Sequence, residues 1–488
     1  MNNIFDKLKV YSDSDYYAFH MPGHKRNLDL MDGTSPYRID ITEIDGFDDL
    51  HHASGILKDA QELTARVYGA EESRFLVNGS TVGILSAILG TTEKGDSILV
   101  ARNCHKSVYH AIYLSELDPV YLYPKFDTEQ GLSTEIDAAD VQKALEEHPK
   151  IRAVMIVSPT YDGVVSDIEK IAEIVHAKGC PLIVDEAHGA HFPFSKYFPE
   201  DAVSAGADVV IHSVHKTLPA MTQTALLHVN GDMVKRRKVK QYLDMLQTSS
   251  PSYILMASID ACIGMLEETL ETHSDARSDY KYKNIFSEYA NRIEALRKDL
   301  KRLKYLKIIQ TDNTDRYDRS KFVISVKHAP MSSHELYEIL LHRYHLQMEM
   351  LAGTYVLAMT TVGDTQEGLD RLRDALLEID KEIDTRQGRP AAIETDLPLS
   401  GRQPALEKVW TIAEAGNRRD KIQKRSFEDS IGCISVEYAY LYPPGSPLIV
   451  PGERITKEAV EILHWYQEHD FSIEGLQSED GIEVWIDG

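Results

Sequence analysis

The chain has 488 residues, of which 43% are hydrophobic and 27% are charged, so we expect a globular protein of two or three domains. Its 53 Lys and Arg against 77 Asp and Glu give a formal net charge of −24, which argues against nucleic acid or an anionic membrane as a partner. Met1 to Lys9 is polar and no apolar run is long enough to cross a bilayer, so we expect neither a signal peptide nor a membrane span.

The order of sequence patterns predicts an α/β protein with three units. The first unit alternates short β-branched runs with helical segments, which is the pattern of a mostly parallel sheet with helices on both faces. The second combines predicted strands at Phe322–Val326 and Val356–Met359 with helices at Ile285–Leu303 and Asp364–Ile383, the last capped by Asp364 or Thr365. The predicted boundaries are an arm packing on a partner subunit (1–45), a large domain (46–280), a small α+β domain (281–384), a polar linker (385–404) and a C-terminal α+β domain (405–488).

The first polar cluster follows the predicted strand Arg74–Val77. Asn78, Gly79, Ser80 and Thr81 form a turn before an apolar helix at Val82–Leu89. Free backbone N–H groups, two hydroxyls and the helix dipole would together bind an anion such as phosphate. For the turn alone, an ordinary N-cap by Ser80 or Thr81 is the safer interpretation. It is neither a Walker A loop nor a G-x-G-x-x-G turn, which disfavours nucleotide binding.

Two further clusters follow the next predicted strands. His105 lies after Ile98–Val100, where its ring could stack on a flat cofactor, although a lone histidine there is more often a polar loop residue. Thr160 and Asp162 lie after Ala153–Val157 and add a hydroxyl and a carboxylate.

Asp185 and Lys216 are the most informative pair. Asp185 ends the predicted strand Pro181–Val184, and Lys216 follows Asp208–Ile211 within Ser213-Val214-His215-Lys216. Pyridoxal phosphate chemistry needs such a pair, because the lysine amine forms a Schiff base and the carboxylate keeps the ring nitrogen protonated. Singly, either residue is more often a helix cap or a solvated side chain. Ligands of open α/β sheets bind at the carboxyl ends of the strands, so the five clusters together predict one crevice.

The motifs resemble the bacterial Orn/Lys/Arg decarboxylases, which are pyridoxal-phosphate enzymes of fold type I. The resemblance covers nearly the whole chain, and a short form without the N-terminal wing domain is expected. It is carried by Phe19-His20-Met21-Pro22-Gly23-His24-Lys25, by Asp185-Glu186-Ala187-His188-Gly189-Ala190-His191, by Ser213-Val214-His215-Lys216, and by Tyr442-Pro443-Pro444-Gly445-Ser446-Pro447 followed by Val450-Pro451-Gly452-Glu453. Aminotransferases of this fold lack the C-terminal block. Thr217-Leu218-Pro219-Ala220 departs from the pair of small residues that many members have after the lysine.

The resemblance implies a role for each matched position. Lys216, Asp185 and His215 would be catalytic, with His215 or Lys216 donating the proton. Glu437 and Glu453 would hold the distal cation of the substrate, each being otherwise an ordinary surface acid. The residues expected to bind pyridoxal 5'-phosphate are Gly79, Ser80, Thr81, His105, Thr160, Asp162, Asp185, His188, Ser213, His215, Lys216 and, reaching the neighbouring subunit, Thr248, Ser249 and Ser250.

The implied reaction is decarboxylation of a basic amino acid for polyamine biosynthesis, with arginine ranked before lysine and ornithine, in a cytoplasmic homodimer. The four cysteines have no metal-ligand spacing, so we expect free thiols and no metal site. An aminotransferase or a carbon–carbon lyase of the same fold stays open as an alternative. A non-catalytic regulator would need a DNA-binding module, for which no basic helix-turn-helix pattern is present, and a purely structural role would leave the intact clusters unexplained.

Overall fold

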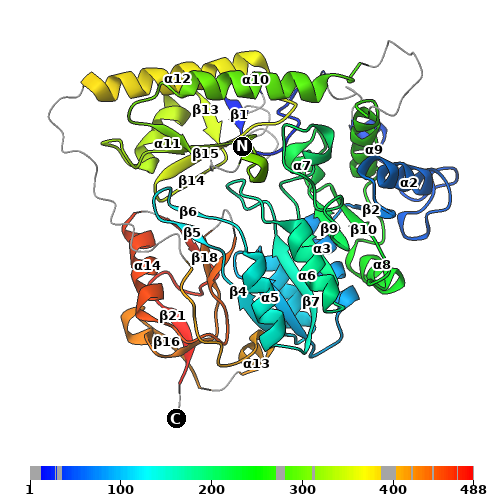
Figure 1. The fold of residues 1–488 in the computed structure, drawn as a ribbon, viewed down its shortest axis with the longest axis vertical. Helices are drawn as coiled ribbons and strands as arrows, with labels where there is room; N and C mark the ends of the chain where they lie inside the picture. Colours follow the sequence, from blue (N-terminus) through cyan, green and yellow to red (C-terminus); the bar gives the residue numbers. More distant parts are fainter. Residues whose placement is uncertain are drawn as a thin grey trace.

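The computed structural model describes residues 13–27, 29, 36–270, 281–309, 314–385, 403–418, 421–441, 445–469 and 471–486. Its centre is a seven-stranded sheet in the order β2-β10-β9-β8-β7-β3-β4 (Figure 1). Only β10 runs antiparallel to its neighbours in this sheet, as the alternating pattern predicts for a mostly parallel sheet. The strands are β2 (Glu72–Leu76), β3 (Ser97–Ala101), β4 (Asp118–Leu122), β7 (Ile151–Val157), β8 (Leu182–Asp185), β9 (Val209–His212) and β10 (Ala225–Val229).

The helices of this large unit pack on the sheet and on one another. α3 is apolar around most of its surface and is buried between α4 and α8. Gly90 permits that approach, because a Cβ at this position would lie 2.6 Å from Cγ2 of Val239 on α8. The helices are α2 (Ile56–Tyr68), α3 (Gly79–Thr91), α4 (Lys106–Leu114), α5 (Ala138–Glu147), α6 (Ile168–Ala177), α7 (Val214–Thr217), α8 (Arg236–Leu246) and α9 (Tyr253–Glu267), and a hairpin joins β5 (Phe126–Asp127) to β6 (Leu132–Ser133).

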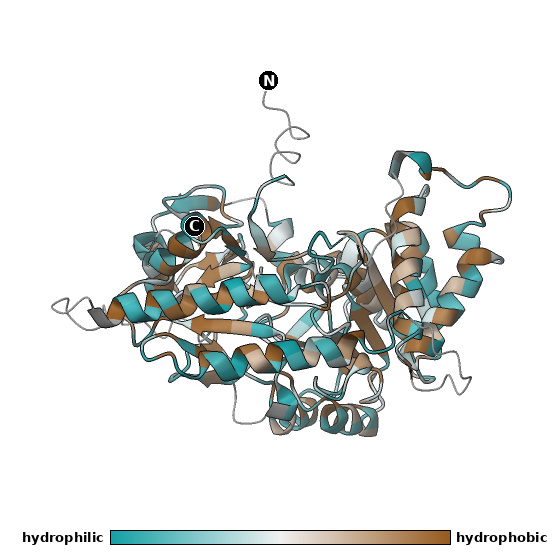
Figure 2. Ribbon diagram, turned by 90° about the horizontal axis from the view of Figure 1, so that it is seen from above, coloured by the Kyte–Doolittle hydropathy of each residue, from teal (hydrophilic) through white to brown (hydrophobic). Residues whose placement is uncertain are grey.

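The small unit is an antiparallel sheet in the order β11-β12-β15-β14, covered by two long helices. α10 and α12 pack against each other along one side of the molecule, where Figure 2 shows hydrophilic and hydrophobic bands alternating along both. Thr365 caps α12 by accepting a hydrogen bond from Gly368 N at 3.1 Å, which confirms one of the two predicted caps. The elements are α10 (Ile285–Leu300), β11 (Lys307–Ile309), β12 (Lys321–Ser325), α11 (Ser333–His342), β13 (Leu346–Met348), β14 (Met350–Ala352), β15 (Tyr355–Met359) and α12 (Gln366–Thr385).

Part of the predicted arm packs on its own chain. β1 (Tyr17–Phe19) pairs in parallel with β13 of the small unit in a two-stranded sheet. The packing of the arm on a partner subunit stays a prediction.

The C-terminal unit consists of two three-stranded sheets, β16-β21-β17 and β19-β18-β20. Most of the predicted linker, residues 386–402, and the Tyr442-Pro443-Pro444 part of the C-terminal motif lie outside the described residues. The elements are α13 (Ile412–Asn417), β16 (Ile422–Arg425), β17 (Ile434–Ser435), β18 (Ala439–Leu441), β19 (Pro447–Ile449), α14 (Lys457–Glu468), β20 (Ile473–Glu474) and β21 (Ile482–Trp485), and short 3-10 turns lie at Pro36–Arg38, Leu50–His52, Phe192–Phe194, Thr314–Arg316 and Glu428–Ser430.

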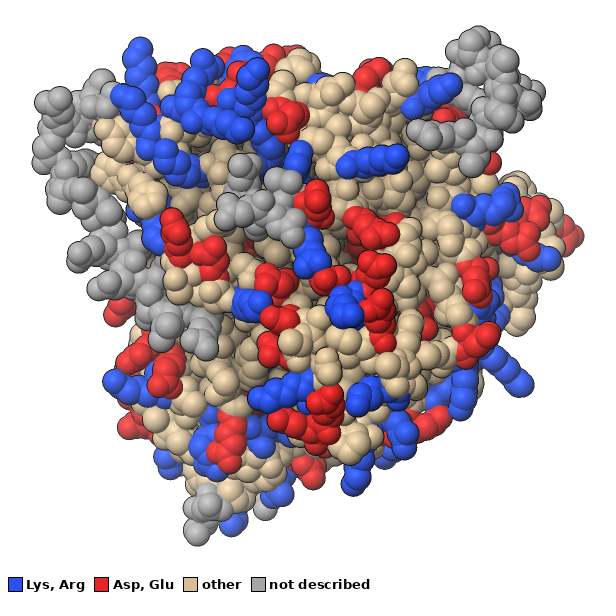
Figure 3. Space-filling view, viewed as in Figure 1, with Lys and Arg blue, Asp and Glu red and all other residues tan. Residues whose placement is uncertain are grey.

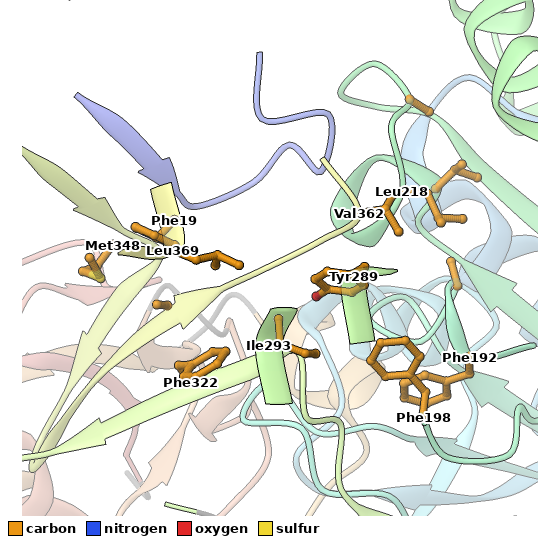
Figure 4. Close-up of a cluster of buried hydrophobic side chains, with 14 of the residues drawn as sticks. Phe19, Phe192, Phe198, Leu218, Tyr289, Ile293, Phe322, Met348, Val362 and Leu369 are labelled. Atoms are coloured by element: carbon orange, nitrogen blue, oxygen red, sulfur yellow. The ribbon is translucent and has the colours of Figure 1, made fainter. Parts of the chain in front are cut away.

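One hydrophobic core joins the large and small units. Phe192 and Phe198 come from the loop after β8, and Ile293 on α10 and Phe322 on β12 belong to the same cluster (Figure 4). The rings of Phe198 and Tyr289 stack with their centroids 5.8 Å apart. This packing fixes the position of the loop after β8 relative to β12.

Charge is mixed on the face of the molecule shown in Figure 3, where Lys and Arg lie among Asp and Glu. In the described part of the chain, no helix combines the length and apolarity that a bilayer crossing requires.

Candidate active site

A cavity of about 940 Å³ lies where the central strands end. It collects the side chains of all five predicted clusters, although these are far apart in the sequence. The predicted residues that line it are Gly79, Ser80, Thr81, His105, Thr160, Asp162, Asp185, His188, Ser213, His215 and Lys216. The crevice predicted from strand ends is therefore present.

The first turn of α3 forms an anion cradle in this cavity. Asn78 precedes the helix and makes no side-chain cap, so the first backbone N–H groups of α3 keep their hydrogen-bonding capacity. Gly79 has a φ of +74°, which favours glycine, and its N–H donates to Gln223 O at 2.9 Å. Ser80 and Ser213 hydrogen-bond through their hydroxyls at the same place. Ser80 thus lies inside the helix instead of capping it, and the arrangement suits a phosphate.

Asp185 and Lys216 lie in a buried setting, where an ionised carboxylate and a charged amine would stabilise each other. Asp185 is 4% exposed, and its Oδ1 accepts a hydrogen bond from Ala187 N at 3.1 Å. Burial raises the pKa of Asp185, and the Lys216 charge opposes that rise. Burial lowers the pKa of Lys216, while Asp185 and Glu349 oppose that fall. Further positive charge beside Asp185 would keep it ionised, as a protonated ring nitrogen would.

Three histidines with neutral rings surround Lys216. Burial, followed by the Lys216 charge, lowers the pKa of His105 to about 3. Burial lowers the pKa of His215 to about 4, and its Nδ1 donates to Thr224 O at 2.7 Å. Because that carbonyl only accepts, the remaining lone pair of His215 is on Nε2. His188 Nε2 lies 3.1 Å from Lys216 Nζ.

Glu437 and Glu453 do not line the cavity. Glu453 is 0% exposed, and its Oε2 receives hydrogen bonds from Arg102 Nη2 at 3.0 Å and Val450 N at 2.9 Å. Glu437 accepts backbone hydrogen bonds from Gln477 at 2.8 Å and Glu483 at 2.7 Å. Because neither carboxylate lines the cavity, we correct the prediction that they hold the substrate.

Glu349, between β13 and β14, lines the cavity and was missed from the sequence. Its Oε2 accepts a hydrogen bond from Met21 N at 2.9 Å, and Tyr161 donates its hydroxyl to Oε1. It is close enough to Lys216 to oppose the lowering of that pKa. The available signal was a single acid in the apolar run Leu346-Gln347-Met348-Glu349-Met350-Leu351.

The C-terminal unit supplies one wall of the cavity. Its contribution is mostly apolar and aromatic, and no arginine lines the cavity among the described residues. The wall residues are Leu441, Ser446, Leu448, Trp465, Tyr466, Phe471 and Ser472. Thr248, Ser249 and Ser250 are exposed and lie outside the lining in this single chain.

Solved structures with this architecture define the class. The Escherichia coli constitutive lysine decarboxylase matches with a TM-score of 0.76 at 20% identity, over 99% of this chain and 81% of that chain. A ureidoglycine–glyoxylate aminotransferase from Bacillus subtilis matches with a TM-score of 0.57 at 13% identity, over 76% and 95% of the two chains. The predicted fold type I, α/β with a mostly parallel sheet, is thereby confirmed.

Sequence comparison gives the family. Family models described as the Orn/Lys/Arg decarboxylase major domain and C-terminal domain match residues 2–339 and 403–484. The YaaO protein of Bacillus subtilis is 36% identical over 94% of this chain and 93% of its own length. An arginine decarboxylase of the same organism is 31% identical over 94% and 92% of the two chains. The chain belongs to the Orn/Lys/Arg decarboxylase family, and it is an enzyme that decarboxylates a basic amino acid.

Proposed function

We propose that the chain decarboxylates arginine, before lysine or ornithine, with pyridoxal 5'-phosphate bound in this cavity. A cationic substrate is supported by Glu349, whose carboxylate lines the cavity and interacts electrostatically with Lys216. The relatives named arginine decarboxylases, at 31% identity over more than nine-tenths of this chain, support arginine.

The residues present fit the cofactor. The first turn of α3 with Ser80 and Ser213 would hold the phosphate, Asp185 would keep the ring nitrogen protonated, and Lys216 would carry the cofactor covalently. His105 lies where its neutral ring can stack on the flat group. Once bound, pyridoxal phosphate supplies the electron sink that accepts the electron pair left by departing carbon dioxide.

The proton that replaces carbon dioxide has two candidate donors, His215 and Lys216. His215 is neutral, and its N–H is committed to the Thr224 carbonyl, so its Nε2 accepts and does not donate. We therefore favour Lys216 as the residue that returns the proton.

Glu349 would bind the distal head group. A guanidinium binds a carboxylate through two parallel hydrogen bonds, whereas an ammonium acts as a point charge. No arginine is among the described residues that line the cavity, whereas an aminotransferase needs one to clamp the α-carboxylate of its substrate. A carboxylate without a cationic clamp leaves more readily as carbon dioxide.

We further propose a homodimer in the cytoplasm that supplies the amine for polyamine synthesis. Thr248 and Ser249 are exposed and do not line the cavity of their own chain, which is consistent with binding the phosphate in the neighbouring subunit. The four described cysteines are free thiols, which is consistent with a reducing compartment.

The test uses purified, cofactor-loaded protein with arginine, lysine and ornithine in separate assays. We expect equal amounts of carbon dioxide and amine, with the highest kcat/KM on arginine. Formation of a keto acid would instead support the aminotransferase alternative, and a preference for a neutral amino acid would contradict the proposal.

A further inference from the structure

A second buried lysine lies beside the cavity and has no part in the function proposed above. Lys321 is the first residue of β12 and is 0% exposed. Its Nζ lies 3.1 Å from Nδ1 of His188, and Nε2 of the same ring lies 3.1 Å from Nζ of Lys216. One imidazole therefore bridges two amines.

The surroundings hold this bridge in place. A Cβ at Gly163 would lie 2.9 Å from Cγ of Lys321, and the φ of Gly163 is +103°, so glycine makes room for the lysine stem. Phe322, the next residue of β12, is fixed in the hydrophobic core (Figure 4). The His188 ring packs on the Tyr161 ring with centroids 4.5 Å apart.

Only one of the two lysine amines can be charged and donate a hydrogen bond to the neutral His188 ring at a time. Burial, then the charges of Lys216 and Lys321, lowers the pKa of His188 well below its usual range, so the ring is neutral. A neutral imidazole has one N–H and one lone pair, and an ammonium can only donate. When Lys321 is charged and donates to Nδ1, the ring carries its hydrogen on Nε2, and Lys216 must accept it as an uncharged amine.

The charges facing Lys321 decide which amine is charged. Burial lowers the pKa of Lys321 to about 8, Asp318 and Glu349 oppose this, and Lys216 and Lys25 add to it. His191 lies 3.2 Å from Asp318, and Asp162, which also interacts with Lys321, accepts a hydrogen bond from Tyr355 at 2.6 Å. Lys321 is therefore mostly an ammonium at neutral pH.

We propose that Lys321 is a positioning residue that, through His188, keeps Lys216 uncharged and exchanges one proton with it. In the first state Lys321 is the ammonium and Lys216 is the amine, ready to bond to the cofactor. In the second state a proton has moved from Lys321 to Nδ1, and the Nε2 proton has moved to Lys216, so the total charge is unchanged. The inference rests on the proposed role of Lys216.

The test measures Lys216 directly in cofactor-free protein, by competitive acetylation followed by mass spectrometry across the pH range in which amines titrate. Lys321→Met keeps an unbranched side chain but removes the charge, and it frees Nδ1 to carry the hydrogen. We expect the titration midpoint of Lys216 to rise by about one unit, so that its labelling at a pH below both midpoints falls about tenfold.

Lys25→Met is the matched control. Lys25 is also buried, but its Nζ donates to His20 O at 2.9 Å and Met359 O at 2.8 Å, not to His188. We expect it to leave the midpoint of Lys216 at the wild-type value. A folded Lys321→Met protein with an unchanged midpoint would overturn the proposal.

Lys321→Arg keeps the test decisive if Lys321→Met does not fold. The guanidinium donates to Nδ1 but cannot release its proton. We expect a wild-type midpoint for Lys216 and a lower kcat with little change in KM, and wild-type kcat would overturn the relay. The two proposals can fail separately. If the midpoint of Lys216 shifts in Lys321→Met but the wild type releases no amine from any basic amino acid, the coupling is supported and the proposed function is wrong.

Discussion

At the scale of single residues, we predict that Asp185 controls the chemistry through the ring nitrogen of the cofactor. Asp185→Asn keeps the shape of the side chain but removes the charge that would hold the cofactor's ring nitrogen protonated. We expect cofactor binding through the α3 cradle to persist while kcat falls by orders of magnitude. Absorbance of the bound cofactor and steady-state rates check this, and near-normal turnover would remove Asp185 from the proposed role.

We propose that the choice of substrate depends on Glu349. Glu349→Gln leaves the head group of the substrate without a charged partner in a desolvated site, which costs about 2–5 kcal/mol. We therefore expect a large rise in KM for arginine with little change in the cofactor spectrum. Glu437→Gln is the control, because Glu437 lies outside the cavity and binds backbone amides. Equal KM values in both variants would contradict the assignment.

Asp162 gives the folded protein a pH dependence. Burial raises the pKa of Asp162 from 3.8 to about 6, so the folded state favours its protonated form. The free energy of unfolding should then fall as pH rises between these two pKa values. Above the higher pKa, the loss of stability amounts to about 3 kcal/mol.

Asp162→Asn stays neutral and can still accept the hydrogen bond from Tyr355. In cofactor-free protein we expect the variant to be more stable than wild type above the higher pKa and to lose that advantage in acid. Urea unfolding at several pH values measures this difference, and a difference that does not vary with pH would refute it.

Residues at strand ends could be predicted from the sequence, because strand pattern and polar cluster are adjacent in the chain. Glu349 and Lys321 could not, because each follows or opens an ordinary apolar strand, and only the fold brings that strand to Lys216. Glu453 misled the prediction for a related reason. Its motif indicated importance, but its partner is Arg102, about 350 residues earlier in the chain, and no local pattern reveals such a pair.

At the scale of elements, the buried ion pair between Arg102 and Glu453 joins the segment after β3 to the C-terminal unit. Arg102 also donates to the backbone oxygen of Pro447 at 2.5 Å and that of Leu448 at 3.1 Å. Arg102→Met leaves Glu453 buried without its counter-charge, which costs about 3–5 kcal/mol. We expect a clear fall in Tm and in the free energy of unfolding.

Arg454→Met is the matched control for this pair. Arg454 makes an exposed ion pair with Glu407 at 2.7 Å, and exposed pairs contribute about 0–1 kcal/mol. Similar losses of stability in the two variants would show that Arg102 does not join the units.

Element types were predicted more reliably than their ends. The predicted helix over 285–303 ends at Leu300, and the helix after Gly79 begins three residues before its predicted start. Both differences lie in terminal turns, where capping by the backbone decides the boundary and hydrophobic periodicity carries little information.

At the scale of the whole molecule, exposed apolar side chains gather near the segment expected to reach a partner. Phe47 is 46% exposed and Met245 is 58% exposed, and the hydrogen bond from His51 Nε2 to Thr248 O, at 2.8 Å, joins the two segments that carry them. We expect sedimentation at assay concentration to show at least a two-fold dimer. Phe47→Asp with Met245→Asp should weaken it, and a fully active monomer would contradict the shared site.

The wall that the C-terminal unit contributes to the cavity has a consequence for synthesis. A ribosome that has completed β15 has already made every residue proposed to bind the cofactor, yet the opposite wall, from Leu441 to Ser472, has not been translated. A product of premature termination would therefore expose Lys216 in a site that lacks one of its walls. We therefore expect catalysis only from molecules in which the C-terminal unit has been translated.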